Sequence, residues 1–137
     1  MTPGIYLRLR REAAGLTLDE VSLVTQTVPS VCARIRGEWI AAIEQGIVPV
    51  SIDVALALQI AFPFDWDVLV KLCALQARLI DQAPPLCAIC ACSEQDACVE
   101  QHGGPCEWAA PALCSACAAK ASPPIVPPPP VTGLAAA

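Results

Sequence analysis

The sequence has few aromatic residues, little charge and no long hydrophobic run. Aromatic residues make up 4% and charged residues 15% of the 137 positions. A membrane-spanning helix needs about 18 or more apolar residues without charge, and no such run exists. Residues 1–15 carry Arg8, Arg10, Arg11 and Glu12 where a secretory signal needs an apolar stretch. We therefore expect a cytoplasmic protein with no membrane partner.

The motifs of common enzyme classes are also missing. The chain contains no Ser/His/Asp set, phosphate loop or dinucleotide fingerprint. The acidic pairs Asp19/Glu20 and Asp65/Asp67 are interpreted as charges in first helical turns, where the helix dipole favours them. We expect no enzymatic activity and no small-molecule substrate.

Composition divides the chain into four parts. Residues 1–81 form a helical domain, 82–86 a linker, 87–118 a cysteine-rich metal-binding module and 119–137 a Pro/Ala-rich tail. Hydrophobic residues make up 55% of the chain, which is enough for a core. The tail contains four consecutive prolines and is expected to be polyproline-like or disordered.

Five helices are expected in the first part, each with a start or stop signal. Pro3 suits a first helical position, Thr17 and Glu20 form a capping box, and Gly15 and Gly46 follow helix ends. The expected N-caps are Thr2, Thr17, Ser51 and Asp65. Leu16 with Val21 and Phe64 with Leu69 are the expected hydrophobic staples. The expected inward-facing residues are Ile5, Leu9 and Ala13; Val21 and Val24; Ile35, Trp39 and Ile43; Val54 and Leu58; and Leu72, Leu75 and Leu79.

Three stretches of this helical part resemble the Cro/CI-repressor-type (XRE-like) helix-turn-helix family of phage and bacterial regulators. They are LRLRREAAGLTLDEVS at 7–22, IEQGIVPVSIDVALAL at 43–58 and FPFDWDVLVKL at 62–72. The resemblance implies a mainly α fold, a five-helix repressor-like domain, and duplex DNA as partner, with a recognition helix in the major groove. Between Ser22 and Glu44 this chain is longer than the family pattern.

Charge argues both for and against DNA. The candidate DNA contacts are Arg8, Arg10, Arg11, Arg34 and Arg36. The net charge is −5, however, and five acids face one lysine after residue 80. DNA binding is favoured if these arginines share one face, and disfavoured if acids interrupt them.

Seven of the nine cysteines lie between Cys87 and Cys117, in the pattern C-x2-C-x-C-x5-C-x7-C-x7-C-x2-C. In a reducing compartment such a cluster predicts a metal site before it predicts disulfides. The outer pairs have the spacing of a treble-clef or zinc-ribbon-like site. The primary zinc ligands are expected to be Cys87, Cys90, Cys114 and Cys117.

The inner side chains leave three alternatives open. Cys92, Cys98, Cys106 and His102 form a second zinc site, supply ligands to a [4Fe-4S] cluster, or remain as buried thiols and a solvated histidine. Disulfides account for what remains, although seven cysteines leave one unpaired. Cys32 and Cys73 stand apart and are interpreted as buried structural cysteines.

The whole chain also resembles small phage and prophage proteins that carry the motif C-x-x-C-G-C-x4-A-C…C-x-W…L-C-x-x-C. Here the motif is CAICACSEQDACVEQHGGPCEWAAPALCSAC at 87–117, with Ala91 in place of glycine. Trp108 and Leu113 are expected to cover one face of the metal site.

Three functions follow from these patterns. The first is a phage or prophage-type DNA-binding transcriptional regulator with a C-terminal metal module. The second is an adaptor that does not bind DNA and docks a protein partner or forms a homodimer. The third is an iron–sulfur redox or sensor protein.

Overall fold

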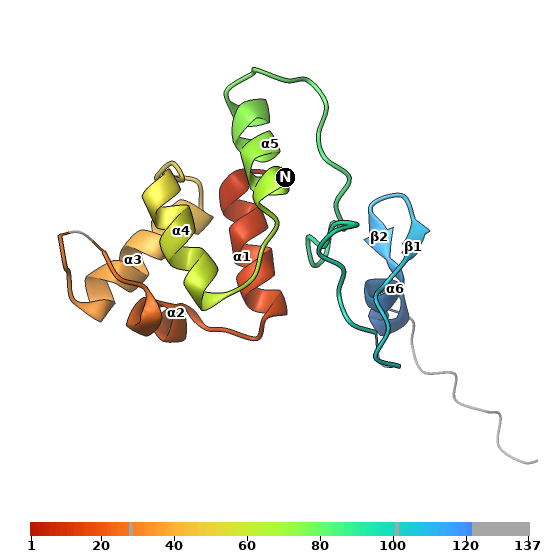
Figure 1. Ribbon diagram of the computed structural model, residues 1–137, viewed down its shortest axis with the longest axis horizontal. Helices are drawn as coiled ribbons and strands as arrows, with labels where there is room; N and C mark the ends of the chain where they lie inside the picture. Colours follow the sequence, from red (N-terminus) through yellow and green to blue (C-terminus); the bar gives the residue numbers. More distant parts are fainter. Residues whose placement is uncertain (28, 101, 122–137) are drawn as a thin grey trace, which may run out of the picture.

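The chain is mainly helical and carries a small cysteine-rich part at its C-terminal side. A computed structural model describes residues 1–27, 29–100 and 102–121. Figure 1 shows α1–α5 gathered together, while the segment after α5 arcs away and returns beside them before the two short strands and α6. The elements are α1 (Pro3–Ala13), α2 (Leu18–Val24), α3 (Ala33–Glu44), α4 (Ile52–Ala61), α5 (Trp66–Gln76), β1 (Trp108–Ala110), β2 (Leu113–Cys114) and α6 (Ser115–Ala121).

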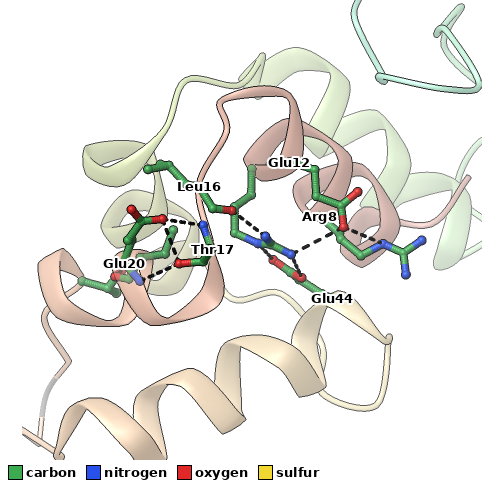
Figure 2. Close-up of polar contacts among 9 residues, drawn as sticks. Arg8, Glu12, Leu16, Thr17, Glu20 and Glu44 are labelled. Atoms are coloured by element: carbon green, nitrogen blue, oxygen red, sulfur yellow. Dashed lines mark hydrogen bonds and ion pairs between the residues drawn. The ribbon is translucent and has the colours of Figure 1, made fainter.

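The expected helix starts are confirmed. The Thr2 hydroxyl accepts the amide of Ile5, and Pro3 opens α1. Thr17 and Glu20 form a reciprocal capping box, visible in Figure 2. Ser51 is the N-cap of α4, and the Asp65 carboxylate accepts two amides at the start of α5. The expected tail begins inside α6, and its residues 122–137 lie outside the described part of the chain.

The buried face of α1 differs from the expected one. Ile5 and Leu9 are only partly buried and Ala13 is exposed, whereas Tyr6, Leu7, Arg10 and Arg11 are buried. The cause is the close approach of α1 to the end of α3. A Cβ atom on Gly4 would lie 2.1 Å from the backbone oxygen of Ile43, so α1 must present its glycine side there.

Three further predictions of inward-facing residues were wrong. Val24 and Ile35 are exposed, and Ser22 and Ile40 are buried in their helices instead. Ser22 faces α3, since its Cβ lies 3.6 Å from the position a Cβ on Gly37 would take. Leu79 is exposed because α5 ends at Gln76 and the chain turns away.

The cysteine-rich part is docked onto the helices. Leu86 and Ala91 join the same buried apolar cluster as Tyr6 and Phe64. Nη2 of Arg10 on α1 lies 2.6 Å from Oδ2 of Asp96. The Ser93 hydroxyl donates to the Asp65 carboxylate at the start of α5, at 3.0 Å. Apolar burial and two polar contacts therefore hold the thiol-bearing segment against α1 and α5.

Candidate metal centre

Seven cysteine side chains gather in the C-terminal part, and we call them the thiol cluster. Four are buried, on the 87–92 turn, at β2 and on α6, and the other three are partly buried. None of the nine cysteines is in a disulfide; all are described as free thiols. The members are Cys87, Cys90, Cys92, Cys98, Cys106, Cys114 and Cys117.

The first C-x2-C pair lies on a tight turn. The amide of Ala91 donates to the Cys87 carbonyl at 2.9 Å, and Ala91 has a φ of +57°. This left-handed conformation is one that glycine adopts more readily than alanine. The backbone amides of Cys114, Cys90 and Ile89 donate to the Cys87 sulfur. The turn thus holds that sulfur with three hydrogen-bond donors, and such donors stabilise a thiolate.

The second pair spans the end of β2 and the start of α6. Strand β2 pairs antiparallel with β1, and the hairpin turns through Ala112 at a φ of +58°. The carbonyl of Ala112 accepts the amide of Ala88, which ties this hairpin to the first turn. The Cys117 amide donates to the Cys114 sulfur. Backbone hydrogen bonds therefore bring the two C-x2-C pairs together.

The distances between sulfur atoms match those around a tetrahedral metal ion. A zinc–sulfur bond of about 2.3 Å places neighbouring sulfurs about 3.8 Å apart, the edge of the tetrahedron. The Cys114 sulfur lies 3.8 Å from that of Cys90 and 3.8 Å from that of Cys98, and the Cys92 and Cys106 sulfurs are 3.7 Å apart. The cluster therefore fits a metal ion of this kind.

Two groups of four thiols have all their sulfurs within 4.8 Å of one another. Cys87, Cys90, Cys92 and Cys114 form the first, and Cys92, Cys98, Cys106 and Cys114 form the second. Three expected primary ligands meet in the first group, and Cys117 belongs to neither group but is buried in the same cluster. The structure brings Cys92, Cys98 and Cys106 together, with Cys114 as the fourth member.

His102 does not join either thiol group among the described residues. Its side chain is exposed on a turn. Trp108 is also exposed, while Leu113 packs against the thiols. Cys32 and Cys73 lie apart from the cluster, and Cys32 is exposed on the N-cap of α3. The expected burial of Cys32 was therefore wrong, because the chain before α3 leaves its cap uncovered.

The environment separates the acidities of the thiols. Burial raises the pKa of Cys114, but hydrogen bonds from the Cys117 amide and from neighbouring thiols outweigh it and lower that pKa to about 6. The same opposition lowers the pKa of Cys87. Burial, together with the nearby Cys90 sulfur, raises the pKa of Cys92 and of Cys98. Metal binding must therefore displace protons from thiols whose raised pKa values favour the protonated form.

The five candidate DNA-contact arginines are engaged within the protein. Arg10 pairs with Asp96, Arg8 with Glu12 at 4.0 Å, and Arg34 with Glu38 at 2.6 Å. Arg36 donates to the carbonyls of Thr25 and Val31. These side chains therefore do not form a free basic face; acids or carbonyls interrupt them.

Arg11 is the most fully satisfied of the five. Its guanidinium donates to both Glu44 carboxylate oxygens, at 2.7 and 2.8 Å, and to the Leu16 carbonyl at 2.7 Å. Figure 2 shows Glu44 and Leu16 converging on this group. The hydrogen bond to Glu44 raises the pKa of Arg11, and it outweighs the lowering caused by burial. This side chain joins α1, the following turn and α3.

Helix α4 carries an exposed apolar row that the sequence interpretation missed. Ile52, Leu56 and Ile60 are 75%, 54% and 82% exposed. Their spacing of four residues places them on one side of the helix. Val54, Ala55 and Leu58 are buried on the other side. The spacing was readable from the sequence, but periodicity cannot show which of two apolar sides is covered.

Within the described residues, no helix is long and apolar enough to cross a membrane. Comparisons of the chain with protein-family models, with curated proteins and with solved structures found no match.

Proposed function

We propose that this protein is a non-enzymatic adaptor that binds a partner protein through α4 and is held in shape by a metal–thiolate site. The observation that carries this proposal is the apolar row of Ile52, Leu56 and Ile60. A helix that is apolar on all sides is normally buried on all sides. In this chain one side of α4 packs on the core and the other is uncovered.

The row is large enough to anchor an interface. Full burial of an Ile or Leu side chain contributes about 1.5–3 kcal/mol, so covering three mostly exposed ones contributes about 3–6 kcal/mol. Gln59 and Asp53 are exposed beside the row. An apolar centre with polar neighbours is the usual anatomy of a protein–protein contact.

Charge indicates the chemistry of the partner. The chain carries a net charge of −5. Five of its six arginines contact acids or backbone carbonyls of the chain, so exposed acids such as Asp53 dominate what a partner meets. The proposed partner is a protein with an apolar contact surface and basic residues around it.

Site-specific photo-cross-linking in the native host tests this role. A cross-linker at Gln59 should capture one defined protein, and a cross-linker at exposed Gln45 should not. Ile60→Asp should abolish that product while the circular dichroism spectrum stays helical. Binding of the purified partner should weaken as salt increases. A product containing two copies of this chain would replace the adaptor role with self-association, and no product from Gln59 would refute the proposal.

For the thiol cluster we infer a zinc-type ion in a treble-clef-like site. The four thiols of a [4Fe-4S] cluster lie farther apart than 4.8 Å, because four irons and four sulfides separate them. The observed groups are tighter than that. An iron–sulfur redox role therefore has less support than a structural metal site, which would supply the stability that so small a segment lacks.

A phage-type DNA-binding regulator is the second candidate. The sequence resemblance favours it, and so does one side chain, because Arg34 on α3 is 73% exposed and its partner Glu38 is 63% exposed. An exposed pair of this kind binds weakly and can exchange Glu38 for a phosphate. Fluorescence anisotropy with duplex fragments from the protein's own locus is the test. Arg34→Ala should reduce affinity and the salt slope, and Arg78→Ala should serve as control. Absence of binding at low salt would leave the adaptor role alone.

A further inference from the structure

We propose that the thiol cluster is one binuclear zinc–thiolate centre in which seven cysteines bind two metal ions and the Cys114 sulfur bridges them. The inference rests on the metal-binding part of the proposed function and is independent of the adaptor role. One ion is held by Cys87, Cys90, Cys114 and Cys117. The other is held by Cys92, Cys98, Cys106 and Cys114.

Ligand counting explains the odd number of cysteines. Two tetrahedral ions need eight metal–sulfur bonds. Seven thiolates supply eight bonds only when one sulfur binds both ions. His102 is poorly placed to be an eighth ligand. Its side chain is exposed and does not belong to either thiol group in the described part of the chain.

Cys114 occupies the position that a bridge requires. It belongs to both groups of thiols and is buried. Its sulfur lies 3.8 Å from that of Cys90, a member of the first group, and 3.8 Å from that of Cys98, a member of the second. Both distances equal the edge of a zinc tetrahedron, about 3.8 Å. The sulfurs of Cys90 and Cys98 are themselves 3.2 Å apart, so the two thiol groups adjoin beside Cys114.

Cys92 also belongs to both groups, and the turn geometry decides its place. A C-x2-C spacing suits two sulfurs that bind the same ion, and Cys117 is buried in the same cluster as Cys87 and Cys114. The two turns therefore supply Cys87 with Cys90, and Cys114 with Cys117, to the same ion. Cys92 lies 3.7 Å from Cys106 and completes the second ion.

Assembly involves proton release and no redox change. The seven sulfurs bind two divalent ions as thiolates and release to solvent the protons that they still carry, which leaves a centre of charge −3. The amide donors at the Cys87 and Cys114 sulfurs offset part of that negative charge. The protein needs no oxidant or additional cofactor for this step.

The experiment uses the full-length protein purified without oxygen. Elemental analysis should give two zinc ions per chain and no iron. After exchange with cadmium-113, two resonances should appear and split each other through the shared sulfur. With cobalt(II), the paramagnetic resonance signal should rise over the first equivalent and fall over the second, because a bridging thiolate couples the two spins. Cys32→Ser, outside the cluster, should leave all three results unchanged.

Two variants make the assignment specific. Cys114→Ser should lose the mutual splitting and retain at most one ion. Cys117→Ser should weaken binding of the first ion by at least about tenfold, since ligand loss costs more than 1.4 kcal/mol. One ion per chain, two ions without coupling, or iron with sulfide would each overturn the proposal. Unchanged metal content in Cys117→Ser would also overturn it, because Cys92 would then be a second bridge. The wild-type measurements stand even if Cys114→Ser does not fold.

Discussion

Replacing Arg10 with methionine tests whether the thiol-bearing segment and the helices behave as one cooperative unit. Arg10 is on α1, and its side chain is 8% exposed beside an Asp96 side chain that is 23% exposed. Methionine keeps much of the packing volume and removes the charge. The variant leaves a partly buried carboxylate without its cation, so we expect the free energy of unfolding to fall by about 2–3 kcal/mol.

The magnitude follows from opposing terms. At 2.6 Å and an effective dielectric constant of about 20, the attraction between the charges is about 6 kcal/mol. Desolvation of the guanidinium offsets most of it. Arg10 Nε has no hydrogen-bond partner among the described residues, and the contact is an ion pair rather than an aligned hydrogen bond. We therefore expect a coupling energy of about 2 kcal/mol between Arg10 and Asp96.

The assay is urea unfolding of the metal-loaded protein, followed by circular dichroism, for Arg10→Met, Asp96→Asn and the double variant. The Arg34/Glu38 pair is the matched control, because it has the same 2.6 Å distance at an exposed site. Its coupling should not exceed about 0.5 kcal/mol. Equal coupling in both pairs would refute the reasoning that burial makes the Arg10 contact important.

The same variants give a pH test with a definite sign. Burial raises the pKa of Asp96 more than Arg10 lowers it. A raised pKa means that the folded state favours the protonated carboxyl, so this group's stabilising contribution is lost as pH rises through that pKa. Without Arg10 the pKa should rise further. Arg10→Met should therefore gain stability relative to the double variant as the pH falls through the raised pKa of Asp96, and a constant difference would contradict this.

Four further predictions follow from individual residues. Gly4→Ala should lower the free energy of unfolding by more than about 2 kcal/mol, since its Cβ would meet Ile43 O at 2.1 Å, whereas Gly37→Ala should raise it by about 0.5–1 kcal/mol; equal effects in thermal unfolding would contradict the close packing of α1 on α3. Ala112→Gly, at an exposed left-handed position, should stabilise by about 1 kcal/mol, and Ala91→Gly should be nearly neutral because it also loses a fully buried methyl group. Chelation should preserve most of the far-ultraviolet dichroism yet lower the melting temperature of the helices, because their contacts with Leu86 and Asp96 are lost; an unchanged melting temperature would show that the segment contributes nothing to them. In the metal-free protein the first thiolate absorbance should appear near the lowered Cys114 pKa of about 6, and it should vanish in Cys114→Ser. The stability that the Cys114 thiolate contributes should be lost as pH falls through that value. A first absorbance near the ordinary thiol pKa would contradict the lowered pKa of Cys114.

Local features of the fold were predictable from the sequence. Thr2, Thr17 and Asp65 cap helices through hydrogen bonds to amides two or three residues away, so neighbouring residues suffice to predict them. Gly15 and Gly46 adopt positive φ values just after helix ends for the same local reason.

Which side of each helix is buried was less predictable. Ile35 and Ile40 are both apolar residues of α3, but only Ile40 is buried. The packing of the other helices on α3 decides which of the two is covered. On α1 the absence of a side chain at Gly4 allows the approach of α3, which rotates the buried side away from Ile5. Periodicity identifies an apolar stripe but does not say what covers it.

The sequence by itself determined the chemistry of this protein, and the tertiary structure decided how that chemistry is arranged. Seven closely spaced thiols predict a metal site because soft, ionisable sulfur ligands at such spacing suit zinc. Only folding places the Cys114 sulfur 3.8 Å from both the Cys90 and the Cys98 sulfurs, since the three cysteines come from different segments of the chain. Likewise, the arginines are visible in the sequence, but the pairing of Arg10 with Asp96 and of Arg11 with Glu44 depends on segments far apart in the chain. Charge and ligand type belong to single residues, whereas burial, pairing and sharing of a ligand arise between residues that the fold brings together.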